Sequence, residues 1–249
     1  HRAVDAAASG AGDRGDHRRS LPPRPCVAGA AQAELEPAAA DPAGPGAERG
    51  GHPALGGSRL AAGKKNARRQ RAWIIFQDET GISERPPVRR TGAPKGQPPV
   101  LTHPYNWNKL SVGGALAYRW DGRRCRFFFR TIPDSFKAKD VIAFLRSLKR
   151  HFRRTRVILI WDRLPGHKAR ITQAYLHQQR HWLRTEWLPA YAPELNPTEY
   201  VWGHAKGGEL ANQAVLDLDD VSEALRRGLR RAAGLGFSFL RHAGLSFAC

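Results

Sequence analysis

The sequence contains few of the features that define secreted or membrane proteins. Its 249 residues include three cysteines, Cys26, Cys125 and Cys249, with no Cys-x-x-Cys pair among them. Such a widely spaced, odd set excludes a disulfide scaffold and a cysteine zinc finger. The longest apolar runs are about five residues, whereas roughly 20 are needed to cross a bilayer, and no hydrophobic leader opens the chain. The sequence therefore predicts neither a membrane span nor secretion.

Aromatic residues are absent from the start of the chain, where the first one is Trp73. Residues 1–50 hold 14 Ala, 7 Gly and 6 Pro, and few large apolar side chains. Such a segment cannot bury enough surface to offset the entropy of ordering it. We therefore expect residues 1–62 to be a low-complexity, disordered segment, or the product of a GC-rich gene read out of frame. Methionine is missing from the whole sequence.

Positive charge is concentrated in the rest of the chain. Residues 1–50 carry six basic and seven acidic side chains, whereas the remaining 199 residues carry 35 basic and 15 acidic ones, a net charge of +20. A segment with this excess attracts polyanions. The charge predicts a nucleic-acid partner for the part of the chain after residue 50.

From Lys64 onward, short apolar runs alternate with amphipathic patterns. The Asp121-Gly122 pair predicts a hairpin turn between two strands. The expected strands are 72–77, 110–118, 123–130, 156–161 and 183–188, and the expected helices follow a cap at Asp134 or Ser135 and cover 167–180, 196–210 and 218–232. The order βββ-α-β-α-β-α is typical of a ribonuclease-H-like layered α/β domain with a mixed sheet. We place this domain at residues 63–240.

Two aspartates follow the apolar runs of two predicted strands. Asp78 ends the run AWIIFQ, and Asp162 ends RVILIW. A helix between the two strands predicts parallel pairing, so that acids at their carboxyl ends lie close enough to share divalent cations. An Asp after a strand is also a common turn or cap residue. Their matched positions favour a metal site held by both.

Glu199 lies at the third helical position after a predicted cap at Asn196. A Glu at this position can complete a capping box, which is a purely structural role. It can also project toward the sheet edge where the two aspartates lie. The pattern alone supports both interpretations equally.

Four sequence blocks distinguish these alternatives, because together and in this order they resemble bacterial insertion-sequence transposases of the mariner-type superfamily. The blocks are 76–81 (FQDETG), 88–97 (VRRTGAPKGQ), 160–168 (IWDRLPGHK) and 191–202 (YAPELNPTEYVW). The resemblance covers roughly residues 64–215, and the last block is the most specific. It implies a DDE endonuclease with Asp78, Asp162 and Glu199 as catalytic, metal-binding residues. The spacing agrees, since 36 residues separate Asp162 from Glu199.

The resemblance also implies the chemistry. Two Mg²⁺ ions, or Mn²⁺ in their place, would be held while water, and then a freed DNA 3′-hydroxyl, attacks phosphorus in line. It implies double-stranded DNA as the partner, both transposon ends and target DNA, with insertion at a TA dinucleotide. A homodimer and a nucleoid-associated, cytoplasmic location in a bacterium complete the expectation.

Several other residues are candidates for contact with DNA. The basic residues of the Gly/Pro-rich loop suit phosphate contacts, although a solvated loop explains them too. His167, five residues after Asp162, would either touch the scissile phosphate or support Asp162. The complete set of predicted DNA contacts is Arg89, Arg90, Lys95, His167 and Lys168. Glu79 is expected to have a structural role, and Trp202 to pack in the core.

The sequence departs from the family pattern at its start. Members of the family carry a helix-turn-helix or winged-helix region that reads the transposon end, and residues 1–62 show no amphipathic helical pattern. The chain is therefore expected to be N-terminally incomplete. Two hypotheses remain: a metal-dependent strand-transfer enzyme, or an inactive remnant that binds DNA without sequence preference. A ribonuclease-H-like host nuclease is a weaker third, because the Pro193 to Glu199 block argues against it.

Overall fold

The computed structural model describes residues 38–39, 65–85, 87–89, 100, 108–190, 192–213 and 217–246. Its strands form one six-stranded sheet in the order β1-β4-β3-β2-β5-β6. The strands are β1 (Ala38–Ala39), β2 (Trp73–Ser83), β3 (Lys109–Tyr118), β4 (Cys125–Pro133), β5 (Val157–Trp161) and β6 (Leu183–Trp187). The helices are α2 (Ala138–His151), α3 (Pro165–Lys168), α4 (Arg170–Gln179), α5 (Pro197–Gly207), α6 (Leu218–Ala233) and α7 (Gly236–His242), with a 3₁₀ turn η1 (Pro193–Leu195) before α5. Residues 65–70 are also helical.

The sheet is mixed, as the sequence predicts. β2, β3 and β4 form an antiparallel meander, while β5 pairs parallel to β2 and β6 parallel to β5. The meander turns at Gly122, whose φ of 70° lies in the left-handed region that favours glycine. The ribonuclease-H-like α/β class is confirmed. β1 pairs with β4 and lies inside the segment expected to be disordered; the rest of residues 1–62 lies outside the described residues.

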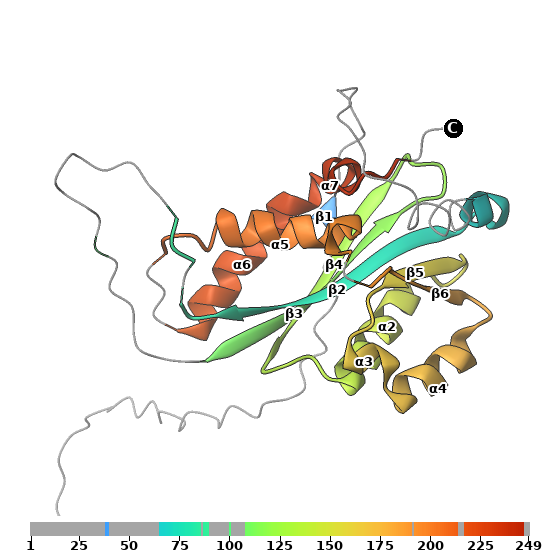
Figure 1. Ribbon diagram of the computed structural model, residues 1–249, viewed down its shortest axis with the longest axis horizontal. Helices are drawn as coiled ribbons and strands as arrows, with labels where there is room; N and C mark the ends of the chain where they lie inside the picture. Colours follow the sequence, from blue (N-terminus) through green and yellow to red (C-terminus); the bar gives the residue numbers. More distant parts are fainter. Residues whose placement is uncertain are drawn as a thin grey trace, which may run out of the picture. The chain divides into compact units, whose positions relative to one another are not determined.

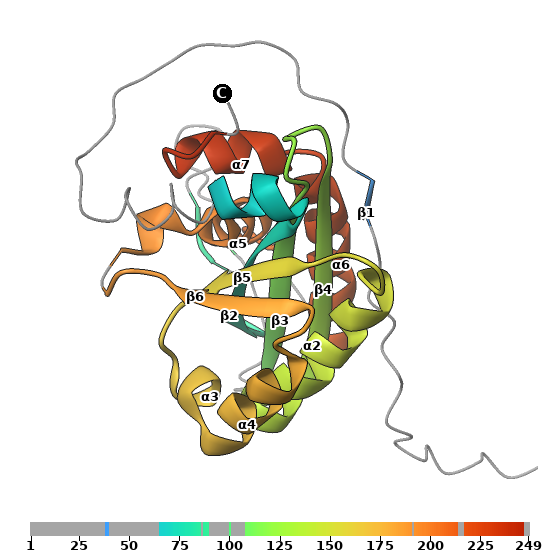
Figure 2. The ribbon, with the colours of Figure 1, turned by 90° about the vertical axis from the view of Figure 1, so that its right-hand side faces the viewer.

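Helices cover both faces of the sheet (Figures 1 and 2). Side chains alternate along β2, so that Ile74 and Phe76 pack under α5, α6 and α7, while Trp73 and Ile75 pack against α2 and α4. The two apolar cores are therefore separated by the sheet itself. This layered arrangement leaves the end of β5 and the start of α5 beside β2, where the predicted acids lie.

Some element boundaries differ from the sequence prediction. β2 does not stop at Asp78 but continues to Ser83, because its second half stays paired with β3. The predicted helix over 167–180 is two helices, since Ala169 between them has extended backbone angles. α2 begins after Lys137, and neither Asp134 nor Ser135 caps it.

At its carboxyl end, α5 stops at Gly207 rather than Leu210. The seven-residue helix α7 was not predicted. No helix in the described part of the chain is long and apolar enough to cross a bilayer.

Gly114 lets α5 approach the sheet closely. A side chain at Gly114 of β3 would overlap the indole ring of Trp202, which is buried beneath α5. Gly113 approaches Phe136 on the other face in the same way. The expectation that Trp202 packs in the core is confirmed. Its ring meets that of Phe127 edge-to-face, 6.3 Å between centroids.

We predict that Gly114→Ala destabilises the domain by about 1–3 kcal/mol, because the added methyl group must displace Trp202. Urea unfolding followed by tryptophan fluorescence measures the change. Gly81→Ala on β2 is the matched control, since an added Cβ there meets nothing within 4 Å. Equal stability of the two variants would contradict the close packing of α5 on β3.

Candidate functional site

The two predicted aspartates occupy equivalent positions on neighbouring parallel strands. Phe76 of β2 pairs with Ile160 of β5, and this is the last pair between the two strands. Asp78 and Asp162 each follow two residues later. Because side chains alternate along a strand, both acids share the face that Phe76 and Ile160 occupy. The sequence predicted this juxtaposition, although Asp78 lies within β2 rather than at its end.

Asp78 is a buried carboxylate, 4% exposed. Its Oδ2 accepts a hydrogen bond from the Trp202 indole Nε1, at 2.9 Å. Burial, and then the negative charge of Glu199, raises its pKa to about 8, with smaller contributions from Glu79 and Asp162 and an opposing one from the Trp202 hydrogen bond. Asp78 therefore lies within electrostatic range of both other members of the predicted triad.

Glu199 reaches this site from the first turn of α5. The Asn196 side chain accepts a hydrogen bond from Thr198 N at 3.2 Å and caps the helix. Thr198 Oγ1 donates to the carbonyl of Phe76 at 3.1 Å, which fastens the helix start to β2 two residues before Asp78. The Asn196 N–H donates to the carbonyl of Pro193. Because that donor is already bonded, a capping box does not explain Glu199, and its influence on Asp78 favours the alternative.

Lys206 is a component of the site that sequence reasoning missed. It lies seven residues after Glu199, two helical turns along the same side of α5. Its Nζ donates to Thr80 Oγ1 at 2.6 Å. Burial lowers its pKa, while Glu199 and Asp78 act in the opposite direction. The lysine therefore supplies positive charge beside two of the acids, and only the seven-residue spacing could have identified it.

His167 links the other side of the site. Its Nδ1 lies 2.8 Å from Asp162 Oδ1, and its Nε2 lies 3.0 Å from Glu79 Oε1. The ring stacks on Trp161, with 4.2 Å between centroids. Burial lowers its pKa, but the hydrogen bonds and charges of Asp162 and Glu79 outweigh this and raise it to about 9. The resulting imidazolium donates to both carboxylates.

This position corrects one predicted role. His167 was grouped with the DNA contacts, but its side chain is only 1% exposed and is enclosed by Trp161, Glu79 and Asp162. It is therefore not available to a phosphate, and the geometry favours support of Asp162. Glu79 has the structural role expected for it, since it also accepts from Gln77 Nε2 at 2.7 Å.

The remaining predicted DNA contacts are only partly within the described residues. Lys168 is exposed on α3. Arg89 is exposed as well, and its backbone is held by Asn212, which accepts from Arg89 N at 2.8 Å and donates to Arg89 O at 2.9 Å. Arg90 and Lys95 lie outside the described residues. The structure therefore brings Arg89, but not Lys168, to the carboxyl end of α5.

The residues of the site suit a hard divalent cation. Carboxylate oxygens are the ligands that Mg²⁺ and Mn²⁺ prefer. Burial is the main cause of the raised pKa of Asp78, and the negative charges of Glu199, Glu79 and Asp162 add to it, so a cation would favour the ionised form. Within the described ranges, no three His, Cys, Asp or Glu side chains converge closely enough to form a ligand cluster. The donor set fits a metal, and the carboxylates would have to draw closer around it.

Comparison with known proteins identifies the family. The model of the DDE superfamily endonucleases matches residues 73–222, which includes all three acids. The chain therefore belongs to the DDE superfamily of endonucleases. A search of curated proteins found no match.

The solved structures most similar to the chain include several of the Mos1 mariner transposase. The paired-end complex with Mg is 20% identical, with a TM-score of 0.51 over 75% of this chain and 58% of that one. The paired-end complex with the left transposon end is 21% identical, with a TM-score of 0.46 over 77% and 62%. The isolated catalytic domain is 19% identical, with a TM-score of 0.40 over 77% and 93%. At these identities the likeness shows the fold, and the chain spans about three fifths of the transposases in the first two structures.

We predict that ionisation of Asp78 destabilises the fold in the absence of metal. Its pKa is about 8 when folded and 3.8 as the ordinary value, so the folded state binds more protons between these values and stability falls as pH rises through them. Asp78→Asn removes this dependence. Thermal unfolding at pH 5 and pH 8 measures it, and a change of about 1 kcal/mol shifts Tm by about 2–4 °C in a domain of this size.

Mg²⁺ at pH 8 should raise the Tm of the wild type more than that of Asp78→Asn, since the variant keeps only two of the three acidic ligands. Identical pH profiles for the two proteins would contradict the raised pKa.

We further predict different outcomes for two adjacent residues. His167→Ala leaves Asp162 and Glu79 without their shared donor and should lower stability by about 3 kcal/mol at pH 6, where the imidazolium is charged. Lys168→Ala should change stability by less than about 0.5 kcal/mol. It should instead weaken DNA binding and reduce the slope of the logarithm of the binding constant against the logarithm of salt concentration by about one. Equal stability of both variants would contradict the bridging role of His167.

Proposed function

We propose that the domain cleaves DNA and transfers the freed strand by metal-dependent, in-line phosphoryl transfer. Asp78, Asp162 and Glu199 would hold two Mg²⁺ or Mn²⁺ ions, which, when bound, polarise the scissile phosphate and activate the attacking oxygen. The observation that carries the proposal is the burial of Asp78 within electrostatic range of Asp162 and Glu199. Membership of the DDE endonuclease family supports it independently.

The protein side chains prepare the acids for this role. Trp202 donates to Oδ2 of Asp78 and His167 to Oδ1 of Asp162, so these bonds fix one oxygen of each carboxylate. Attachment of Thr198 to β2 fixes the start of the helix that carries Glu199. Such orientation by neighbouring groups is what metal-ligating carboxylates require.

In the first step, water attacks phosphorus, the bond to the 3′-oxygen breaks, and a 3′-hydroxyl and a 5′-phosphate result. In the second step, that 3′-hydroxyl attacks a phosphate of target DNA and displaces another 3′-oxygen. Following the family resemblance, we propose TA dinucleotides as targets and a homodimer as the acting unit. The net charge of +20 after residue 50 provides non-specific affinity for the duplex.

Related solved structures are consistent with this proposal. One Mos1 complex contains Mg, another contains Mn, and others are paired-end or strand transfer complexes. These describe Mos1 itself, a longer chain than this one. They support divalent metal and DNA as the ligands to test first.

We predict that the full chain nicks supercoiled plasmid DNA with Mg²⁺ or Mn²⁺ and does not nick it in EDTA. Asp78→Asn, Asp162→Asn and Glu199→Gln should each abolish nicking while salt-dependent DNA binding persists, because binding comes from the basic surface. Nicking that survives equally in all three variants would exclude the triad. Binding without nicking under any condition would instead support an inactive, DNA-binding remnant.

A further inference from the structure

A hollow of about 740 Å³ lies beside Glu199. It is bounded by η1, α5, α7 and the side chain of Arg89. The residues that line it are Arg89, Pro193, Glu194, Glu199, Tyr200, Gly203, His204, Phe239 and His242. Its volume lies within the range of roughly 300–1,000 Å³ typical of small-ligand sites. Because the proposed metal ligand Glu199 forms part of its wall, anything bound there lies next to the reacting phosphate.

Gly203 of α5 lines the hollow without a side chain. An added Cβ at Gly203 would meet nothing within 4 Å, so packing does not require glycine there. At Gly236, by contrast, an added Cβ would overlap Cys125. Glycine inside a helix is less favourable than alanine by about 1 kcal/mol. The glycine one turn after Glu199 is therefore costly to the helix, and it leaves this part of the hollow without a side chain.

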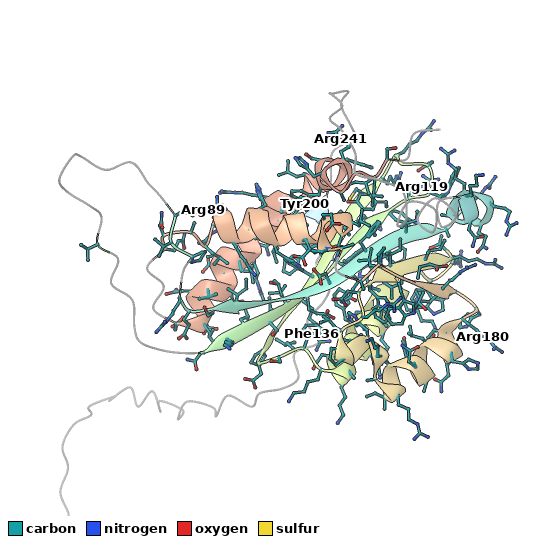
Figure 3. All side chains as sticks on the ribbon, viewed as in Figure 1. Arg89, Arg119, Phe136, Arg180, Tyr200 and Arg241 are labelled. Carbon is teal, nitrogen blue, oxygen red and sulfur yellow. The ribbon has the colours of Figure 1, made fainter. Side chains whose placement is uncertain are left out.

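Arg89 supplies the positive charge of the hollow. Two hydrogen bonds hold its backbone to Asn212, and its guanidinium lies against Gly207, where a side chain would displace it. Figure 3 shows Arg89 beside the carboxyl end of α5, and Tyr200 nearer the start of that helix. Gly207 is the second glycine that weakens α5, and its lack of a side chain permits the arginine to approach.

The walls of the hollow suit a planar heterocycle. Tyr200 is fixed by its hydroxyl, which donates to the carbonyl of His242 at 3.1 Å, and its ring lies 5.6 Å from that of His242. The rings of His204 and Phe239 form a second tilted pair, 6.1 Å between centroids. Aromatic side chains bind nucleobases by stacking, whatever the base. Four of the nine lining residues therefore present an aromatic or imidazole ring to the hollow.

The charges define the orientation of such a ligand. Glu194 and Glu199 disfavour a phosphate inside the hollow, whereas Arg89 attracts one at its rim. A nucleotide can satisfy both conditions only with its base inward and its phosphate at Arg89. We propose that the hollow binds the unpaired terminal nucleobase of the DNA strand that reacts at Glu199. This inference rests on the proposed function, because it assumes that a DNA end reaches the acids.

Fluorescence of a terminal 2-aminopurine tests the proposal. The probe is a duplex with a one-nucleotide 3′ overhang of 2-aminopurine, bound to the full chain in EDTA and compared with a blunt duplex. Wild type should quench the overhang base by stacking and bind the overhang duplex more tightly. Gly203→Leu fills the hollow and should weaken binding of the overhang duplex about tenfold, with no quenching and with unchanged affinity for the blunt duplex.

Gly203→Ala is the matched control, because its methyl group meets no neighbour and it should quench as the wild type does. His204→Ala is a second test, since it removes one exposed wall of the hollow and should reduce quenching while leaving Tm unchanged. Quenching by Gly203→Leu or by His204→Ala equal to that of Gly203→Ala would overturn the proposal. The assay requires neither metal nor cleavage, so its failure is distinguishable from the failure of the nicking test.

Discussion

The hydrogen-bonded register between β2 and β5 is the constraint on which the site depends. Pairing of Phe76 with Ile160 places Asp78 and Asp162 at the same level and on the same face. A shift by one residue would turn one of the two carboxylates to the opposite face of the sheet. The same shift would expose apolar side chains of both strands, because each strand is buried on both faces. The two large apolar cores therefore fix the geometry of the acids.

The acid cluster works against the stability of the fold that holds it. Desolvation and like charge oppose ionisation of Asp78, as its raised pKa records. Three groups partly compensate: the Trp202 indole donates to Asp78, Lys206 places an ammonium nearby, and His167 joins Asp162 to Glu79. A divalent cation would complete this compensation. The surplus of negative charge is thus a physical reason for metal affinity, separate from any resemblance.

Most of the fold could be predicted from the sequence, because apolar periodicity and the Asp-Gly turn locate five strands and the main helices. The extension of β2 beyond Asp78 could not, since residues 78–81 have no apolar alternation and are held by pairing with β3. The three acids could be named, but the burial of His167 could not. A histidine at a helix start looks exposed in sequence, and its contact with Glu79 arises only from the packing of α3 beside β2. Helix α7 is too short to give a periodic signal.

Helix α5 connects these features, because successive turns of one helix serve different purposes. Its first turn is fastened to β2 through Thr198 and presents Glu199, and the next turn contributes Trp202 to the core on one side and Gly203 to the hollow on the other. The last turn places Lys206 beside Thr80. A helix that faces a core, an acid cluster and a hollow has little freedom to vary its residues. Gly203 and Gly207 are consistent with this, because each lowers the stability of the helix at a position where the site needs no side chain.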